Sequence, residues 1–103
     1  MRFPLAALLC AALSACTWVK LEDSGRTVRV ALPGEDLSRC TYKGEVGTEV
    51  TNRVAGIERN SIKVREELET MARNEAPGLG GNTIQALGEP VAGEQRFAVY
   101  ACP

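Results

Sequence analysis

An uncharged apolar run at residues 3–15, bounded by Arg2 and Cys16, decides how much of this chain enters the folded domain. A helix needs about 20 apolar residues to cross a membrane, so this run is too short to span one. A positive start, a short apolar stretch and the small residues Ser14 and Ala15 before a cysteine are the layout of a secretory signal peptide. We therefore expect residues 1–15 to be removed, which leaves residues 16–103 as the mature protein.

The four residues Leu13-Ser14-Ala15-Cys16 match the lipobox of bacterial lipoproteins. The thiol of Cys16 is the group that takes a diacylglyceryl chain as a thioether, and cleavage then leaves Cys16 as a lipidated N-terminus. Several acyl chains make such an anchor effectively permanent. The sequence predicts lipidation at Cys16 and attachment to the cell envelope. In a Gram-negative cell, Thr17 in place of an aspartate favours the outer membrane, facing the periplasm. The alternatives are an ordinary secreted protein that is cleaved near Cys16, and a buried apolar helix.

The length of the mature chain predicts one small domain. Its charge argues against binding to nucleic acid. The chain has 12 basic and 13 acidic residues, and only Arg2 among them lies in the segment expected to be removed. The mature protein is therefore weakly acidic. No basic patch with interleaved aromatic residues is present, which argues against a nucleic-acid partner.

Cys10 is expected to be removed and Cys16 to be lipidated, which leaves the thiols of Cys40 and Cys102. An even pair in an oxidising compartment predicts a disulfide, and closing a loop of this length contributes about 4 kcal/mol in the chain-entropy model. A redox-active pair is the competing interpretation, although there is no C-x-x-C motif. Zinc wants four ligands and the chain has no histidine, so we expect no metal and no other cofactor.

The remaining pattern predicts an α+β fold with the order β-β-α-β-β, in which one helix packs on one sheet. Residues 16–25 are expected to be a short tether and residues 26–103 the domain. Apolar residues at helical spacing predict a helix that begins at Asn60 or Ser61 and ends before Pro77. Alternating residues predict strands near 27–30, 40–47, 82–87 and 96–102. Residues 48–59 have no clean period and are expected to form a long loop.

No catalytic constellation is evident. The chain has no histidine to activate a serine, which excludes a serine-histidine triad. Glu66, Glu67 and Glu69 are expected on a solvated helix face, and Glu45 and Glu49 beside a turn. The arginines Arg26, Arg29 and Arg39 are expected to be scattered. The glycines of "GLGGN" at 78–82 follow a helix, so they are expected to end it, and Asn82 is expected to tolerate a positive φ there.

Several segments in order carry a family resemblance: the lipobox, "KGEVG" after Cys40, "ARNEA" in the helix, "LGGNTI" at 79–84 and the closing "VYACP". Together they resemble the YjeI-like small bacterial lipoproteins, a family of unassigned function. The expected fold is also distantly similar to that of the outer-membrane lipoprotein RcsF. The resemblance implies Cys16 as the lipid site and Cys40 with Cys102 as a disulfide, and it supplies no catalytic residues.

The sequence therefore predicts a non-enzymatic lipoprotein, anchored to the membrane by its N-terminal lipid, that binds an envelope protein or supports envelope homeostasis. Two alternatives remain open at this point. One is an inhibitor of a periplasmic hydrolase, with residues 48–59 as the inserting loop. The other is a thiol-redox sensor that uses Cys40 and Cys102.

Overall fold

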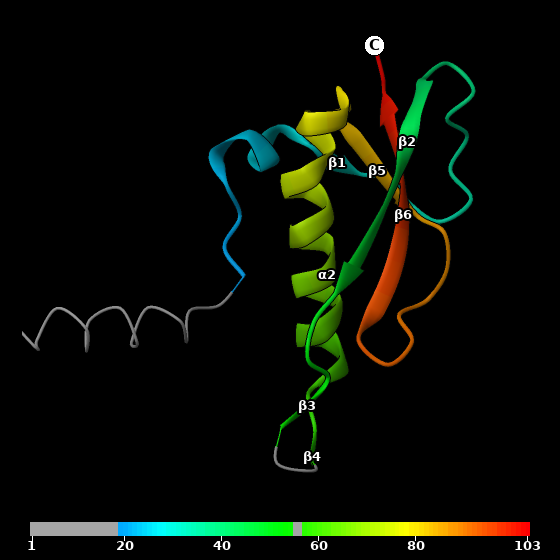
Figure 1. Cartoon of the computed structure of the whole chain (residues 1–103). Coiled ribbons are helices and arrows are strands. Elements are labelled where there is room, and N and C mark those ends of the chain that lie inside the picture. Colours follow the sequence, from blue (N-terminus) through cyan, green and yellow to red (C-terminus); the bar gives the residue numbers. More distant parts are fainter. Residues whose placement is uncertain (1–18, 55–56) are drawn as a thin grey trace, which may run out of the picture.

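The computed structural model describes residues 19–54 and 57–103. Cys16, the segment 1–15 and Thr17 lie outside the described residues, and so does the start of the expected tether. The helices are the 3-10 helix η1 (Asp23–Thr27), the α-helix α2 (Ser61–Glu75) and the 3-10 helix η2 (Ala76–Leu79). The strands are β1 (Arg29–Val30), β2 (Thr41–Glu49), β3 (Arg53–Val54), β4 (Ile57–Glu58), β5 (Thr83–Ala86) and β6 (Glu94–Ala101). Figure 1 shows their arrangement.

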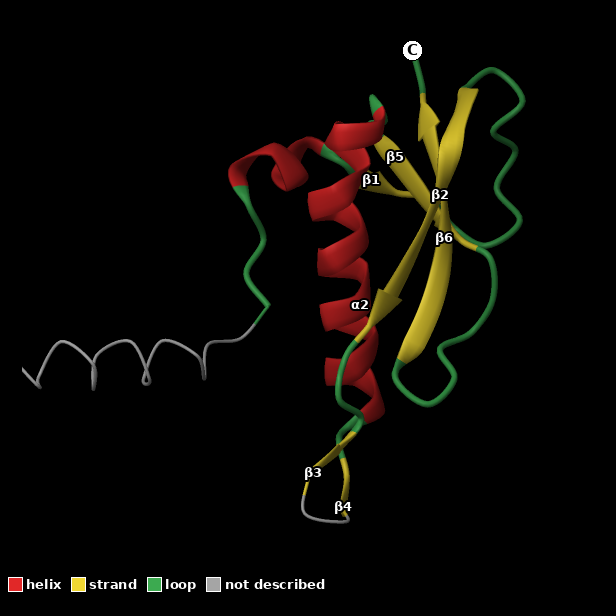
Figure 2. Cartoon of the chain, in the orientation of Figure 1, coloured by secondary structure: helices red, strands yellow, loops and turns green. Residues whose placement is uncertain are grey.

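One four-stranded sheet, in the order β1-β5-β6-β2, carries the domain. β1 runs parallel to β5, whereas β6 is antiparallel to both of its neighbours, β5 and β2. The long helix α2 lies along one face of this sheet (Figure 2). The predicted α+β class, with one helix packed on one sheet, is confirmed.

Helix α2 begins where the sequence predicted and for the expected reason. The Asn60 side chain accepts hydrogen bonds from the backbone N–H groups of Ile62 and Lys63, which satisfies two donors that the first turn leaves open. η2 continues the helical path, and Gly80, at φ +81°, ends it in the left-handed conformation that glycine adopts without steric cost. The predicted role of the glycine turn as a helix terminus is thereby confirmed at Gly80.

The core lies between α2 and the sheet. Leu68 of α2, Ile84 of β5 and Phe97 of β6 have no exposed surface. Within each element the core residues follow the expected spacing. Residues four apart, such as Val64 and Leu68, share a helix face, and alternate residues, such as Phe97 and Val99, share a strand face. The buried core residues are Val28, Val46, Val64, Leu68, Ala72, Ala76, Ile84, Phe97 and Val99.

The opposite face of the sheet is partly covered by the connection between β1 and β2. Gln85 alternates with the core residue Ile84, so its side chain points away from α2. Its amide nitrogen donates to the carbonyls of Leu32 and Glu35, 3.0 and 3.2 Å away. Leu37 and Ala98 are buried. A connection without helix or strand therefore protects the second face of a small sheet.

Residues 48–59 differ from the expected long loop. β2 continues to Glu49 because it stays paired with β6 as far as Glu94. The chain then forms the hairpin β3–β4, in which Arg53 pairs with Glu58 and Val54 with Ile57. Two-residue strands are too short to show a period of two in the sequence, so the hairpin left no readable pattern. The predicted order β-β-α-β-β thus lacks this hairpin.

Candidate functional site

The disulfide joins the two longest strands at one end of the sheet. Cys40 and Cys102 are bonded, and their Cα atoms lie 4.3 Å apart. Cys40 precedes β2 and Cys102 follows β6, and the neighbouring residues Thr41 and Ala101 are paired in the sheet. The predicted disulfide is therefore present, and it closes a strand pair that the backbone already aligns.

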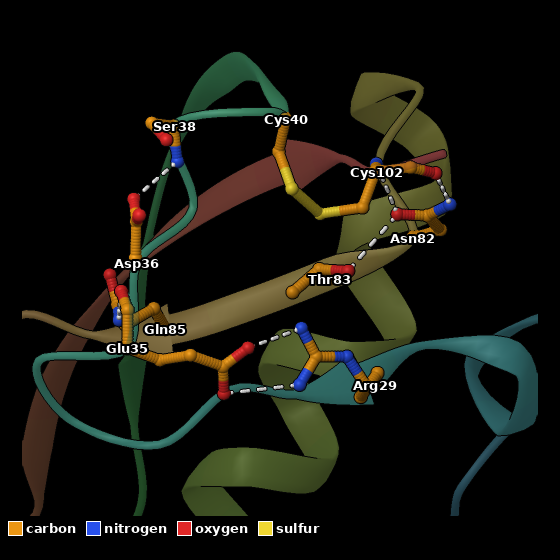
Figure 3. The surroundings of a disulfide bond; sticks show 9 residues. All are labelled: Arg29, Glu35, Asp36, Ser38, Cys40, Asn82, Thr83, Gln85 and Cys102. Carbon is orange, nitrogen blue, oxygen red and sulfur yellow. Dashed lines mark hydrogen bonds and ion pairs between the residues drawn. A yellow bond between two sulfur atoms is a disulfide. The ribbon is translucent and has the colours of Figure 1, made fainter.

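Asn82 fixes the backbone on the other side of this disulfide (Figure 3). Its side-chain oxygen accepts from the N–H of Cys102 at 2.8 Å, and its amide nitrogen donates to the Cys102 carbonyl at 2.9 Å. The Thr83 hydroxyl donates to the same oxygen at 3.1 Å. The expectation of a positive φ at Asn82 is wrong, because Gly80 makes that turn. This bridge was not foreseen, since no sequence signal links an asparagine to a backbone 20 residues away.

An ion pair lies beside the disulfide end. The Arg29 guanidinium donates to both oxygens of Glu35, at 3.1 and 2.7 Å, and Glu35 also accepts from the Leu32 N–H. The arginine, followed by that backbone donor, holds the pKa of the Glu35 carboxyl below its ordinary 4.5. Arg26 lies 3.6 Å from Asp23. Arg26 and Arg29 are thus each paired with an acidic residue close to them in the sequence.

The glutamates considered from sequence have separate surroundings. Glu45 and Glu49 both lie on β2 and not beside a turn, and Glu45 pairs with Arg96 of β6. Glu67 departs from the expected solvated face, since its side chain is only 12% exposed and accepts from Arg59 at 2.7 and 2.9 Å. The geometry brings no two of these carboxylates together as an acid-base pair.

Arg59 connects the hairpin β3–β4 to helix α2. It binds Glu67 through two nitrogens and donates to the Thr51 carbonyl at 2.8 Å. The hydrogen bonds from Arg59 to the Glu67 carboxylate raise the pKa of the Arg59 guanidinium. An open pocket of about 240 Å³ lies beside it, between the hairpin, the first turns of α2 and the β5–β6 connection. Arg65, which also lines that pocket, is paired with Glu89.

Asn74 of α2 holds the first described residues against the helix. Its amide nitrogen donates to the Lys20 carbonyl and its oxygen accepts from the Glu22 N–H, each at 2.8 Å. Gly25 is buried nearby, where a Cβ atom would approach the Asn74 side-chain oxygen to 2.6 Å. The segment 20–25, expected to be tether, therefore lies against the domain.

The part of the chain that the structure describes has neither a metal-binding cluster of side chains nor a helix that could cross a membrane. Among residues 19–54 and 57–103, no three histidine, cysteine, aspartate or glutamate residues are grouped so that they could hold a metal ion. The helices in these ranges include none with the length and apolar character needed to cross a membrane.

Comparison with known proteins identifies a family but no individual curated protein or solved structure. The chain matches the family model described as Domain of unknown function (DUF4156) over residues 19–102. The match covers the described domain almost from end to end. No curated protein and no solved structure matches this chain significantly.

Proposed function

Because this chain belongs to the DUF4156 family, whose description assigns no activity, we propose its function from its own residues. The protein is a non-enzymatic lipoprotein of the cell envelope, anchored through Cys16, that binds a protein partner close to the membrane. The outer membrane, facing the periplasm, is its location. We further propose that the chain is related to the YjeI-like lipoproteins and, more distantly, to RcsF.

The observation that carries the proposal is the short distance in sequence between the lipobox and the folded domain. The Asn74 side chain binds the backbone from Lys20 onward. Only residues 17–19 then separate the lipidated cysteine from the fold, and three extended residues reach about 10 Å. A domain on so short a connection lies beside the bilayer, where its partners are other envelope proteins.

The side chains favour binding over catalysis. A nucleophile needs a base within hydrogen-bond reach, and the chain has no histidine. Arg29, Arg59 and Arg96 are each engaged by a glutamate. Pairs of this kind hold the surface in shape and engage the carboxylates of Glu35, Glu67 and Glu45.

The intact mass of the protein extracted from membranes tests the anchor. We expect the mass of residues 16–103 plus a lipid adduct, rising by about two daltons on reduction as the disulfide of Cys40 and Cys102 opens. The matched control is Cys16→Ser, which removes the thiol and is expected to leave the protein without lipid. A wild-type mass without lipid would make this a secreted domain and overturn the proposal.

Crosslinking in intact cells tests the partner. We expect wild-type protein to yield a specific crosslinked envelope protein that Cys16→Ser loses or enriches less, because the variant is no longer held at the membrane. If both proteins give the same crosslinks, membrane attachment does not select the partner. If neither gives any, the interaction role fails.

A further inference from the structure

Strand β2 lies at one edge of the sheet and is its longest strand, with nine residues. The opposite edge strand, β1, has two residues. A long edge strand exposes a row of backbone groups that another strand can pair with, and natural proteins usually shield such edges. Along one side β2 is paired with β6, from Thr41 to Glu49, with one register shift between Tyr42 and Gly44.

The hydrogen-bond register identifies the unpaired groups. The Val50 N–H donates to Gly93, while the carbonyls of Arg96 and Tyr100 point toward β5, where they accept from Leu87 and Asn82. Along an antiparallel ladder, pairs that hydrogen-bond to each other alternate with pairs that do not, so every second residue of β2 directs its backbone groups to β6 and the residues between direct theirs outward. The backbone N–H and C=O groups of Glu45, Gly47 and Glu49 therefore point away from β6. No hydrogen bond to these groups is found from residues 19–54 and 57–103.

The accessible part of this edge is bounded at one end. A register shift interrupts the pairing between Tyr42 and Gly44, and Gly44 has φ +138°. Bulges increase the local twist and turn an edge away from incoming strands. From Glu45 to Glu49 the pairing is regular, so this stretch offers a straight edge.

Acidic groups border the free stretch. Glu49 is directly opposite Glu94 in the sheet, both are exposed, and neither has an ion pair within the described ranges. Like charges directly opposite each other on neighbouring strands are destabilising. On the other side an open groove runs between β2 and the C-terminal end of α2, and Glu75 and Leu79 line it.

We propose that the β2 edge from Glu45 to Glu49 binds an extended segment of a partner protein, carrying basic side chains, as a fifth strand of the sheet. This names the class of partner in the proposed interaction role and rests on that part of it. Backbone groups of the segment pair with Glu45, Gly47 and Glu49. Its cations relieve the repulsion between Glu49 and Glu94.

Charge decides between a basic segment and a second copy of this chain. Antiparallel pairing of two β2 strands centred on Glu45 would place Glu45 opposite its own copy. Pairing centred on Gly47 would place Glu45 opposite Glu49. A basic partner avoids these contacts, and its cations gain attraction to Glu49 and Glu94.

The test uses the whole protein in detergent and two capped peptides, Val-Lys-Val-Lys-Val-Lys and Val-Glu-Val-Glu-Val-Glu. We expect the lysine peptide to bind about tenfold more tightly, as ion pairing of roughly 1.4 kcal/mol would give. Amide hydrogen exchange followed by NMR should slow at Glu45, Gly47 and Glu49 when the peptide is bound. Equal binding of the two peptides, protection elsewhere, or no binding would overturn the proposal.

Two further variants separate the contributions of backbone and charge. Gly47→Pro removes the outward N–H and leaves the ladder to β6 intact, whereas Gly47→Ala keeps the N–H and meets only Arg96 at 3.5 Å. Proline should weaken binding about tenfold, by the loss of a backbone hydrogen bond and close strand approach, and alanine should not. Unchanged binding to the proline variant would contradict edge pairing.

The double variant Glu49→Gln with Glu94→Gln tests the contribution of the two carboxylates to peptide binding. Its result does not depend on how the proline variant folds. It should abolish most of the preference for the lysine peptide, and a retained preference would contradict the acidic contribution. Protection of β2 that rises with protein concentration and no peptide would assign the edge to a second copy instead. None of these results depends on lipid at Cys16, so a failure of the anchor shows in the mass measurement alone.

Discussion

Asparagine side chains connect segments that are far apart in the sequence. Asn82 bonds the backbone of Cys102, and Asn74 bonds Lys20 and Glu22. The amide supplies one donor and one acceptor together, which matches the two groups of a peptide backbone. An alanine at either position leaves both backbone groups to water.

We predict that Asn82→Ala destabilises the protein by about 1–2 kcal/mol, since it removes two hydrogen bonds to Cys102. Urea unfolding followed by circular dichroism measures the loss. Asn82→Asp is the matched control, because it keeps the acceptor for the Cys102 N–H and lacks the donor to its carbonyl. An alanine variant as stable as wild type would show that the bridge contributes nothing.

We predict that protonation of Glu35 contributes to the loss of stability in acid. Arg29 lowers the pKa of Glu35 in the folded protein below 4.5, so the unfolded chain binds the proton more readily. The stabilisation is present above pH 4.5 and is lost as the pH falls through the lowered pKa. In Glu35→Gln, stability measured by urea unfolding should fall less steeply below pH 4.5. An acid limb identical to wild type would contradict this contribution.

At the scale of the element, helix α2 is the part best predicted from sequence. A cap residue, an apolar stripe and a glycine stop are local signals, and Asn60, Leu68 and Gly80 occupy those roles. The ion pair of Arg59 with Glu67 was not predicted, because it joins a hairpin to a helix and depends on how the two pack. The free edge of β2 was equally unreadable, since strand order is set by long-range pairing.

We predict that Asn60→Ala destabilises the protein by about 1 kcal/mol, since the N–H groups of Ile62 and Lys63 lose their shared acceptor. Thermal and urea unfolding provide the measurement. Asn60→Asp retains a side-chain oxygen and should stay near wild type. If aspartate and alanine cost the same, the amide nitrogen and not the cap oxygen matters at this position.

For the molecule as a whole, the sequence predicted the α+β class and the disulfide, and it missed the β3–β4 hairpin. The fold class follows from periodicity, which is a local signal, and the disulfide was predicted from the even number of cysteines left after the expected processing. The parallel pairing of β1 with β5 joins residues more than 50 positions apart, such as Arg29 and Thr83. No local pattern encodes that partnership.

We predict that replacing both Cys40 and Cys102 with serine lowers the free energy of unfolding by about 4 kcal/mol, because the bond closes a loop with a sequence separation of 62. This is a large share of the total for so small a domain. Urea unfolding with and without reductant measures the effect. Reductant should destabilise wild type and leave the double variant unchanged. Equal stability in all four conditions would show that the fold alone holds these strands together.

The central position of β6 has a consequence for the timing of folding. β6 pairs with both β5 and β2, yet it is the last of the sheet strands along the chain. Until residues 94–101 have been synthesised, β2 has no neighbour in the sheet and β5 has only the two residues of β1. Assembly therefore waits for the final strand, and contacts between distant residues make such folding slow. An emerging chain must therefore stay unaggregated until its last eight-residue strand has been made, so its need for chaperoning falls at the end of synthesis.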